Sequence, residues 1–448
     1  MPHDTMASPD ETVTHPRRDV DPLGAAMITV GAMIGSGIFY TPAEVARRAG
    51  STARALAVWT AGALLSLLGA FCVAELGAAI PTTGGMYVYL RRAYGTFTAF
   101  LFGWSMLAVL VPSSVAFFAG VTARHLAPAL GLPETFVTVG VVALVAGVNV
   151  WGVRAAAGLQ SATALAKYAG LAVVAVAAFV ADPATVAAAA SAPAPSEPMG
   201  AWEASLAAVV PVLWAYDGWV DVTSVAGEVR DPGRVIPRAL IAGTLAVGAV
   251  YLVVVAGYHH ALGTGTLAAS RAPGNDLGVA LAGGIGLRLM AALVALSTFG
   301  GCVIGMLTGT RVVAAMGQDG AFFPALGTLS ARGTPSRAIV LTAALAVAYA
   351  LSSRLGQLAE MFVVGAWPFY GLTAIATMIL RRREPALARP FRTPLYPWSV
   401  LGFLAAIAVM LVSFTRTTPV PTLVSFAVIA TAIPVYGVMR LRARASGR

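Results

Sequence analysis

Charged residues are scarce in this sequence. Only 11% of its 448 residues are Asp, Glu, Lys or Arg and 58% are hydrophobic, whereas soluble domains carry about 25% charged residues. This composition excludes an ordinary water-soluble enzyme and an intrinsically disordered chain, because neither has so much apolar surface with so little charge. A polytopic membrane protein remains.

Cysteine is also nearly absent. Cys72 and Cys302 are the only two, and both fall in apolar runs, where cysteine behaves as a small hydrophobic residue. They make neither a disulfide framework nor a metal site, so we expect no metal and no cofactor. The net charge of +10 is not accompanied by the basic stripe and aromatic platform of a nucleic-acid-binding protein. We therefore expect no nucleic acid partner.

The sequence contains long runs without charged residues. Runs such as 93–123 and 239–270 contain no Asp, Glu, Lys or Arg, and a membrane-spanning helix needs roughly 20 apolar residues. Inside the lipid the backbone must satisfy its own hydrogen bonds, so these runs are helices. The sequence predicts an all-α polytopic membrane protein with twelve spans, at about 22–46, 54–80, 96–123, 134–152, 156–181, 202–228, 238–262, 286–316, 336–353, 358–381, 395–415 and 419–440.

The arginines predict the orientation of these spans. Most of them, including the run at 381–383, fall on one side of the twelve-span arrangement, and basic residues are enriched on the cytoplasmic side. Both termini are therefore predicted to lie in the cytoplasm, and the protein in the cytoplasmic (inner) membrane. Residues 1–21 are polar and lack the apolar segment of a cleavable signal. We expect a disordered cytoplasmic tail there and a second tail at 442–448.

Two interruptions occupy corresponding positions in the chain. The first span contains GAMIGSGIFY, with Gly31, Gly35 and Gly37, and the sixth contains WAYDGW, with Asp217 and Gly218. The interruptions are about 180 residues, or five spans, apart, so the second unit would be inverted relative to the first. Paired interruptions of this kind are typical of a transporter binding site. Close helix packing is the alternative explanation for the glycines.

This pattern divides the chain into two units. We predict a first inverted repeat at 22–181, a flexible outer loop at 182–201, a second inverted repeat at 202–382 and two further helices at 383–441. The loop reads DPATVAAAASAPAPSEPMGA and has no basic residue, a composition typical of a flexible connection.

A helix broken at mid-membrane exposes backbone groups of both polarities. Its free N–H groups suit a carboxylate, and its free C=O groups suit an ammonium group. A site with both matches a free amino acid. Glycine at 35 and 37 allows close approach of the backbone to a ligand, and Ser36 can either donate a hydroxyl group or cap the second half-helix.

Lys167 is the only lysine in the chain and lies in QSATALAKYAGLAVV, far from either end of its span. An ionisable residue at such a depth is a functional hypothesis by default, since its side chain is too deep to reach the interface. Two interpretations stay open: a group that titrates during transport, because lysine shifts its pKa readily on desolvation, and a fixed clamp that never titrates.

Three segments carry a family resemblance: GAMIGSGIF at 31–39, ELGAAIPTTGGMYVYLRRAYG at 75–95 and LWAYDGWVDVTSVAGEVRDPGRVIPRAL at 213–240. With them the chain resembles the amino acid–polyamine–organocation permeases, and among these the bacterial relatives of the L-type amino acid transporters. The likeness runs over about 22–440. It implies the LeuT-type fold, in which two inverted five-helix repeats with broken first and sixth helices are followed by two extra helices.

The resemblance also implies a substrate site. Backbone amides at Gly35, Ser36 and Gly37 would hold the substrate carboxylate, and carbonyls at Trp214, Ala215 and Asp217 its amino group. Trp214 matches the aromatic residue that closes over the substrate, where many relatives have Phe, which suggests a tighter or flatter pocket. The full set predicted to bind substrate is Ile34, Gly35, Ser36, Gly37, Trp214, Ala215, Asp217 and Gly218.

A coupling residue follows from the same resemblance, and a pair of charged residues near a cytoplasmic helix end suggests a gate. Lys167 looks like a substitute for the second sodium ion of sodium-coupled members, with Ser297 and Thr298 as neighbours, so sodium is not expected to be needed. Coupling to protons or to a counter-substrate stays open. Glu228 and Arg230, together with Trp214, are the predicted gate; a solvated face is the alternative for the two charged residues.

The sequence therefore favours a secondary active transporter of amino acids that works by alternating access. It is not expected to be an enzyme, since it has neither a metalloprotease motif nor a P-loop. A polyamine or cationic amino acid antiporter is the alternative, for which only Asp217 offers an acidic pocket residue; a channel or sensor is less favoured. Animal relatives are disulfide-linked to a heavy subunit through the second outer loop. Here that loop, 124–133, has no cysteine, so no such partner is expected.

Overall fold

The computed structural model describes residues 18, 20–35, 37–182 and 201–445. These residues form a bundle of helices, and the only β-type pairing among them is an isolated bridge between Val20 and Val229. The described part of the chain is thus all-α, as predicted. Most of the predicted loop 182–201 and of the predicted tail 1–21 lies outside the described residues.

Up to residue 182, the described residues form eight α-helices and one π-helical segment, η1. Two of these helices, α1 and α2, occupy the first predicted span with a break between them. Helices α5 and α6 run on from one another through η1. The bounds are α1 Pro22–Met33, α2 Gly37–Ala49, α3 Thr52–Ala79, α4 Met86–Tyr94, α5 Thr96–Ser105, η1 Met106–Leu110, α6 Val111–Leu130, α7 Glu134–Trp151 and α8 Val153–Val180.

The second half also begins with a broken helix, which is followed by long helices. Helix α10 ends at the second break and a 3₁₀ helix, η2, continues beyond it. The bounds are α10 Ala201–Ala215, η2 Trp219–Glu228, α11 Pro232–Ala269, α12 Pro273–Gln318, α13 Pro324–Gly327, α14 Ser336–Ser352, α15 Leu355–Arg383, α16 Trp398–Thr417, α17 Pro419–Ala430 and α18 Ala432–Ala445.

Many of these helices can cross a bilayer. Within the described ranges nine are long and apolar enough, and the bent pair α1 and α2 makes a tenth. Helix α14 is apolar but shorter, and α10 is interrupted by the second break. The chain is therefore a multi-spanning membrane protein, and the number twelve stays a prediction. Residues 442–445, predicted to belong to the C-terminal tail, are helical in the structure, because α18 extends to Ala445.

Local sequence explains where the first helix starts and where both broken helices stop. Asp21 caps α1 by accepting a hydrogen bond from the Gly24 N–H at 2.6 Å, and Pro22 occupies the first helical position. The helix ends at Ile34, whose φ of −79° and ψ of 90° are extended. The second break contains Gly218 at φ +105°, a conformation that glycine adopts without the steric cost of a Cβ.

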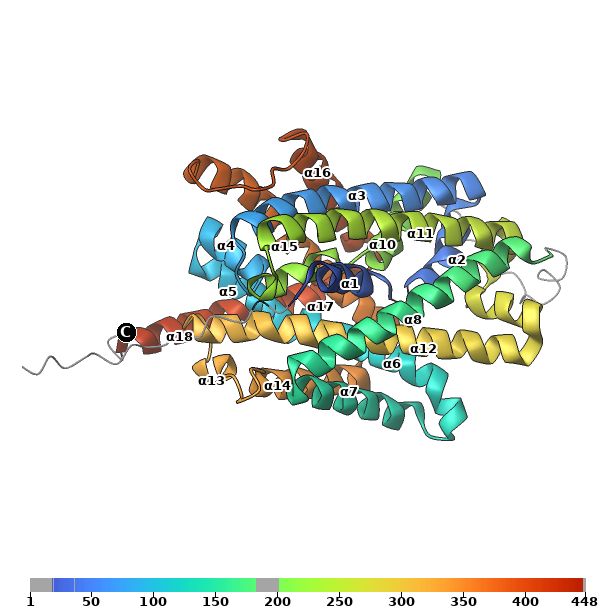
Figure 1. Cartoon of the computed structure of the whole chain (residues 1–448), viewed down its shortest axis with the longest axis horizontal. Helices are drawn as coiled ribbons and strands as arrows, with labels where there is room; N and C mark the ends of the chain where they lie inside the picture. The colour runs from blue at the N-terminus through green and yellow to red at the C-terminus, as the bar shows by residue number, and fades with distance from the viewer. Residues whose placement is uncertain (1–17, 19, 36, 183–200, 446–448) are drawn as a thin grey trace, which may run out of the picture.

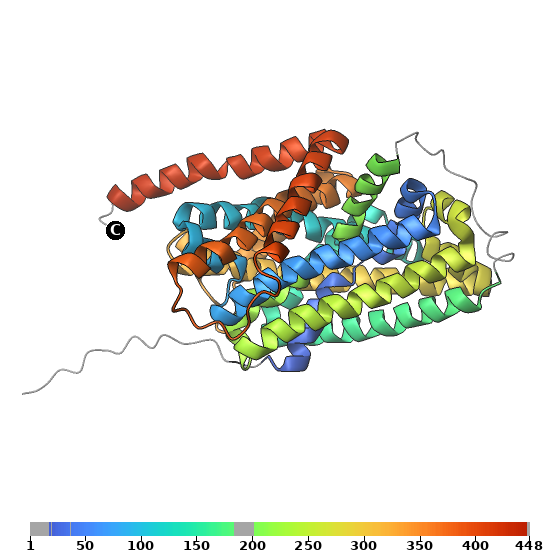
Figure 2. The ribbon, with the colours of Figure 1, turned by 90° about the horizontal axis from the view of Figure 1, so that it is seen from above.

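The broken helices lie at the centre of the bundle. Helix α11 packs along α3, and α12 packs along α6 and α8. Helix α1 lies among them, in contact with α8, α11, α12 and η2. Figure 2 shows the same arrangement from above, with α18 projecting beyond the body of the bundle. The long helices thus form a scaffold around two short, interrupted ones.

Candidate functional site

The two breaks contact each other directly. A Cβ built on Gly37, at the start of α2, would lie 2.8 Å from Ala215 Cα at the end of α10. A Cβ on Gly218 would lie 2.7 Å from the Ala32 carbonyl oxygen at the end of α1. Only glycine allows these approaches, so the glycines serve both close packing and the break. The two interruptions predicted from the sequence are therefore one structural feature.

Side chains from three other helices hold the end of α1. Lys167 Nζ, on α8, donates to Ile34 O at 3.0 Å and lies 3.4 Å from Gly31 O. Tyr251 Oη, on α11, donates to Met33 O at 3.0 Å, and Ser297 Oγ, on α12, donates to Gly35 O at 3.3 Å. The carbonyl groups that the break releases are thus occupied by protein donors.

Lys167 is 1% exposed, and its ammonium group lies against α1 rather than in open space. Ser297 donates to the next carbonyl of the same break, at Gly35. Thr298 is placed differently, because its Oγ1 lies 2.7 Å from Thr122 Oγ1 and donates within its own helix. A Cβ on Gly300 would lie 3.1 Å from Lys167 Nζ, so this glycine makes room for the lysine.

The three backbone amides predicted to hold the substrate carboxylate are not equally available in the structure. The Gly35 N–H donates to Met33 O at 3.0 Å, which engages it in a local turn. Ser36 lies outside the described residues. Gly37 opens α2, whose first-turn N–H groups have no partner within the helix. On the ammonium side, the Trp214 carbonyl accepts the Asp217 N–H at 3.2 Å.

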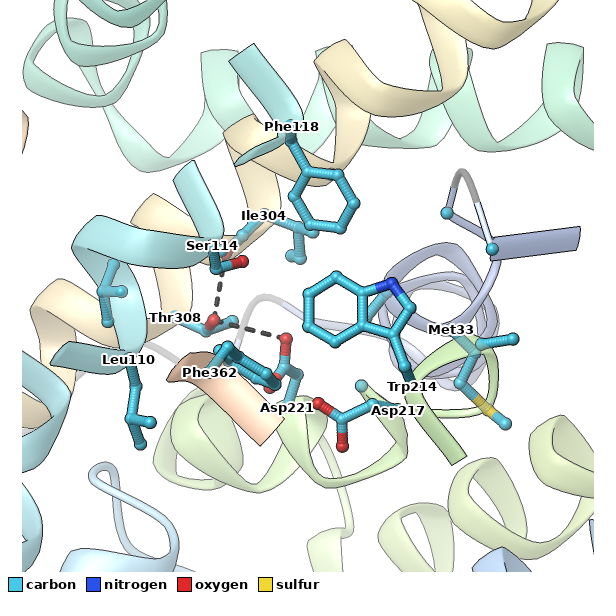
Figure 3. Close-up of a pocket in the computed structure, with 18 of the residues that line it drawn as sticks. Met33, Leu110, Ser114, Phe118, Trp214, Asp217, Asp221, Ile304, Thr308 and Phe362 are labelled. Carbon is cyan, nitrogen blue, oxygen red and sulfur yellow. Dashed lines mark hydrogen bonds between the residues drawn. The ribbon is translucent and has the colours of Figure 1, made fainter. Parts of the chain in front are cut away.

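A pocket opens between the two breaks and the helices that flank them (Figure 3). The described lining is mostly apolar and includes Gly301 and Gly305 of α12. The π-helical segment η1 supplies two of its residues, and π-helical turns are frequent at functional sites. The lining residues are Ala32, Met33, Gly35, Gly37, Met106, Leu110, Val111, Ser114, Phe118, Trp214, Ala215, Asp217, Gly218, Asp221, Gly301, Ile304, Gly305, Thr308 and Phe362.

Trp214 belongs to an aromatic cluster at this pocket. Its ring centroid lies 5.3 Å from that of Phe117, 6.1 Å from Phe118 and 5.2 Å from Phe362. Figure 3 shows the indole between Met33 and the cavity. These rings, from α6, α10 and α15, limit the width of the space beside the breaks.

Two carboxylates face the pocket. Asp217 accepts a hydrogen bond from Tyr370 Oη at 2.7 Å and is 8% exposed. Asp221, four residues later on η2, lies 3.4 Å from Thr308 Oγ1. The sequence argument counted Asp217 as the only acidic pocket residue, and the structure adds Asp221. Among the described residues, no group of three His, Cys, Asp or Glu side chains could hold a metal ion.

The predicted gate residues do not pair with each other. Arg311 Nε, on α12, lies 3.1 Å from Glu228 Oε1, and these side chains are 8% and 18% exposed. Arg230 lies beyond η2, where it is exposed and its Nε donates to Arg18 O at 3.1 Å. Arg311 thus takes the place predicted for Arg230 as the partner of Glu228, because η2 packs against α12.

Other ion pairs between distant segments lie near the ends of the helices. Glu75 is 1% exposed and contacts Arg381 at 2.5 Å and Arg389 at 3.4 Å. Further pairs join Arg91 to Asp319 and Arg92 to Glu384.

Sequence reasoning missed several residues of the site. Tyr251 and Tyr370 hold parts of the two breaks, yet a tyrosine in an apolar helix carries no distinctive signal. Phe118 and Phe362 likewise carry no distinctive signal in the sequence. Asp221 did carry a signal, since it is an ionisable residue within the sixth predicted span.

Known proteins match this chain over most of its length. The amino acid permease family model matches residues 20–439. The serine/threonine exchanger SteT of Bacillus subtilis (strain 168) is 28% identical over 440 residues, covering 95% of this chain and 98% of the relative. The b(0,+)-type amino acid transporter 1 of Mus musculus is 30% identical over 393 residues, covering 85% and 79%. The human large neutral amino acids transporter small subunit 2 is 29% identical over 431 residues, covering 94% and 80%.

These matches extend across both breaks and the helices around them. They agree with the membrane-spanning helices and with the pocket where the broken helices meet. From the family match over nearly the whole chain, we conclude that this protein belongs to the amino acid permease family and is a multi-spanning amino acid transporter.

Proposed function

We propose that this permease moves zwitterionic amino acids by alternating access, as an exchanger or a secondary active carrier that does not need sodium. The observation that carries the proposal is the contact between the two breaks, where Gly37 meets Ala215 and Gly218 meets Ala32. A single pocket there borders helix ends of both polarities. The substrate would bind in this pocket.

The polarity of the helix ends suits an amino acid. Helix α2 starts at Gly37 and presents the positive end of its dipole, which favours the substrate carboxylate. Helix α10 ends at Ala215 and presents carbonyl groups, which favour the ammonium group. Asp217 adds a negative charge on the same side. Ile34, Gly35, Ser36 and Gly218 would complete the surroundings, and Trp214 would cover the substrate.

Lys167 supports the proposal that sodium is not needed. Its ammonium group already donates to carbonyl oxygens at the end of α1, and a cation bound there would compete for the same oxygens. Ser297 adds a second protein donor at this break. The lysine would therefore serve as a permanent cation at the hinge of α1 and α2.

Further parts of the proposal concern location and partners. The arginines at 381–383 end α15 and support an orientation with this end and both termini in the cytoplasm. The protein would lie in the cytoplasmic membrane, leave its substrate chemically unchanged and have no disulfide-linked heavy subunit. Cys72 and Cys302 are both buried, which supports the last point. The relatives include a serine/threonine exchanger and a large neutral amino acids transporter. They favour neutral amino acids over the alternative of polyamine or cationic amino acid antiport.

Counterflow in proteoliposomes tests the proposed function. Vesicles containing the purified protein and loaded with one unlabelled amino acid would be offered labelled L-threonine, L-alanine, L-leucine and L-lysine in turn, with sodium or with choline outside. We expect saturable accumulation of at least one neutral amino acid, at equal rates in both salts. Accumulation only with sodium would refute sodium independence, and no accumulation of any amino acid would refute the proposed site.

A further inference from the structure

Asp221 is the carboxylate in the pocket with the weakest set of partners. It is half-buried and faces the cavity (Figure 3). Its hydrogen-bond partner is Thr308, whose single hydroxyl hydrogen is shared between the Ile304 carbonyl at 2.9 Å and Asp221 Oδ2 at 3.4 Å. The shorter contact favours the carbonyl. A carboxylate so placed in a mostly apolar pocket is costly unless its charge is compensated.

The charged groups around η2 have other partners. Of the elements packed against it, α12 offers Arg311, which pairs with Glu228, and α3 offers Glu75, which pairs with Arg381 and Arg389. Helix α11 offers Tyr251, which donates to Met33 O, and its first two turns carry Arg234 and Arg238, which are exposed and outside the pocket lining. The described sequence of α1 has no ionisable residue, and the described pocket lining contains no Lys, Arg or His.

Asp217 lines the same pocket as Asp221, and two negative charges in one pocket disfavour each other. When a zwitterion fills the pocket, its ammonium group compensates Asp217 and its carboxylate meets the start of α2. Asp221 then keeps an uncompensated charge. Two carboxylates that share a site, with only one compensating cation, favour a proton on one of them.

We propose that Asp221 is a proton-binding site of this pocket, and that it takes up a proton when a neutral amino acid binds, so that proton and substrate cross the membrane together. This inference rests on the proposed function. In the step, a hydronium ion transfers its proton to the Asp221 carboxylate, which leaves a neutral carboxylic acid and a water molecule. The reverse transfer on the other side of the membrane completes the cycle.

The hydrogen bonds around Thr308 suit the protonated form. A protonated Asp221 can donate its O–H to Thr308 Oγ1, while Thr308 keeps its own donation to Ile304 O. In the ionised form the two acceptors compete for one hydrogen. Lys167 plays a different part, since its ammonium group lies outside the pocket lining and is engaged by α1 carbonyls.

Proton flux measured together with substrate flux tests the proposal. Proteoliposomes enclosing a pH-sensitive dye would receive the neutral amino acid that gives the highest counterflow. We expect the wild-type lumen to acidify on substrate addition, with about one proton per substrate, and a protonophore to abolish the pH change. Wild-type protein that shows counterflow without acidification would overturn the proposal while leaving the proposed function intact. Absence of counterflow would instead refute the proposed function.

Variants locate the proton. Because Asp221→Asn imitates the neutral acid, it should still bind the same amino acid, with an affinity that does not change with pH and without proton uptake. Asp221→Glu should keep the coupled proton. Asp276→Asn, an acidic residue outside the pocket lining, is the matched control and should keep a ratio near one.

Three results for Asp221→Asn would contradict the assignment. Proton flux that persists would move the coupling elsewhere, for example to Lys167. Loss of substrate binding would contradict the idea that the neutral acid is the binding form. If L-lysine inhibits uptake of the neutral amino acid by the wild-type protein but not by Asp221→Asn, and proton flux is unchanged, Asp221 recognises the side chain of a cationic substrate instead.

Discussion

Lys167 Nζ and Ile34 O are joined by a hydrogen bond of 3.0 Å across 133 positions of sequence. The bond connects the middle of α8 to the point where α1 stops being helical. In its protonated form Lys167 places a positive charge at the negative end of the α1 dipole, where such a charge is stabilising. Together with Tyr251 and Ser297, this side chain holds the end of the first broken helix from outside.

Replacing Lys167 should impair transport. Lys167→Met leaves two α1 carbonyl oxygens without their donor, and each buried unsatisfied group costs about 1–3 kcal/mol. We expect counterflow to fall by at least about tenfold while the protein is still inserted and monodisperse. Tyr168→Phe is the neighbouring control, because its buried hydroxyl has no hydrogen-bond partner in the structure. A Lys167→Met rate within twofold of wild type would contradict the role of the clamp.

The two glycines of the first break should respond differently to a methyl group. Gly37→Ala would place its Cβ 2.8 Å from Ala215 Cα, so the breaks must separate, whereas the Cβ of Gly35→Ala would meet Phe118 Cε1 at 3.4 Å, an ordinary contact. Small displacements in a binding site can cost up to about a hundredfold. We expect Gly37→Ala to weaken substrate binding at least tenfold and Gly35→Ala to weaken it less. Equal effects in a binding titration would refute this explanation.

The pair Glu228 and Arg311 should act as a unit. Removing one partner of a buried ion pair costs about 3–5 kcal/mol, because it leaves an uncompensated charge. Counterflow should therefore fall at least tenfold in Glu228→Gln and in Arg311→Gln, and recover in part when Glu228→Arg is combined with Arg311→Glu. Arg230→Gln should have a smaller effect. A double variant no better than either single one would count against the pair.

Stability should depend on pH through Glu384. The Arg92 guanidinium, whose Nε donates to Oε1 at 2.9 Å, holds the pKa of Glu384 below its ordinary value. A lowered pKa in the folded state stabilises the protein above the unfolded pKa of about 4.3, and this contribution is lost as pH falls through the folded pKa.

For a largely exposed pair the contribution is at most about 1 kcal/mol, or roughly 2 °C in Tm. The Tm of Glu384→Gln in detergent should therefore lie slightly below that of wild type at pH 6, and the two should converge as the pH falls through the lowered pKa of Glu384. Glu134→Gln, which removes an exposed partner 3.8 Å from Arg124, should show no such convergence. A constant difference at all pH values would exclude the Arg92 pair as its cause.

Much of the architecture was predictable because it depends on local composition. Uncharged runs marked the helices, and glycines with an aspartate marked both breaks. Lys167 stood out as a single charge in an apolar span, and the structure places its ammonium group against the end of α1. These features each occupy one stretch of sequence, so a window of about 20 residues is enough to find them.

Pairings across the bundle were not predictable in this way. Glu75 lies close in sequence to Arg91 and Arg92, yet it pairs with Arg381, which is 306 positions away. Helices of a bundle meet partners from remote segments, so proximity along the chain says little about ion pairs. The same holds for Asp221 and Thr308, which share a cavity only because η2 packs against α12.

The segment before α1 is hydrogen-bonded to the segment after η2. The Val20 N–H donates to Glu228 O and the Arg230 N–H donates to Val20 O, both at 2.9 Å. Any tilting of η2 must therefore either move Val20 with it or break both hydrogen bonds. An affinity tag or truncation that reaches residue 20 would cut this tether, so N-terminal fusions should end before Arg18 if transport rates are to be compared.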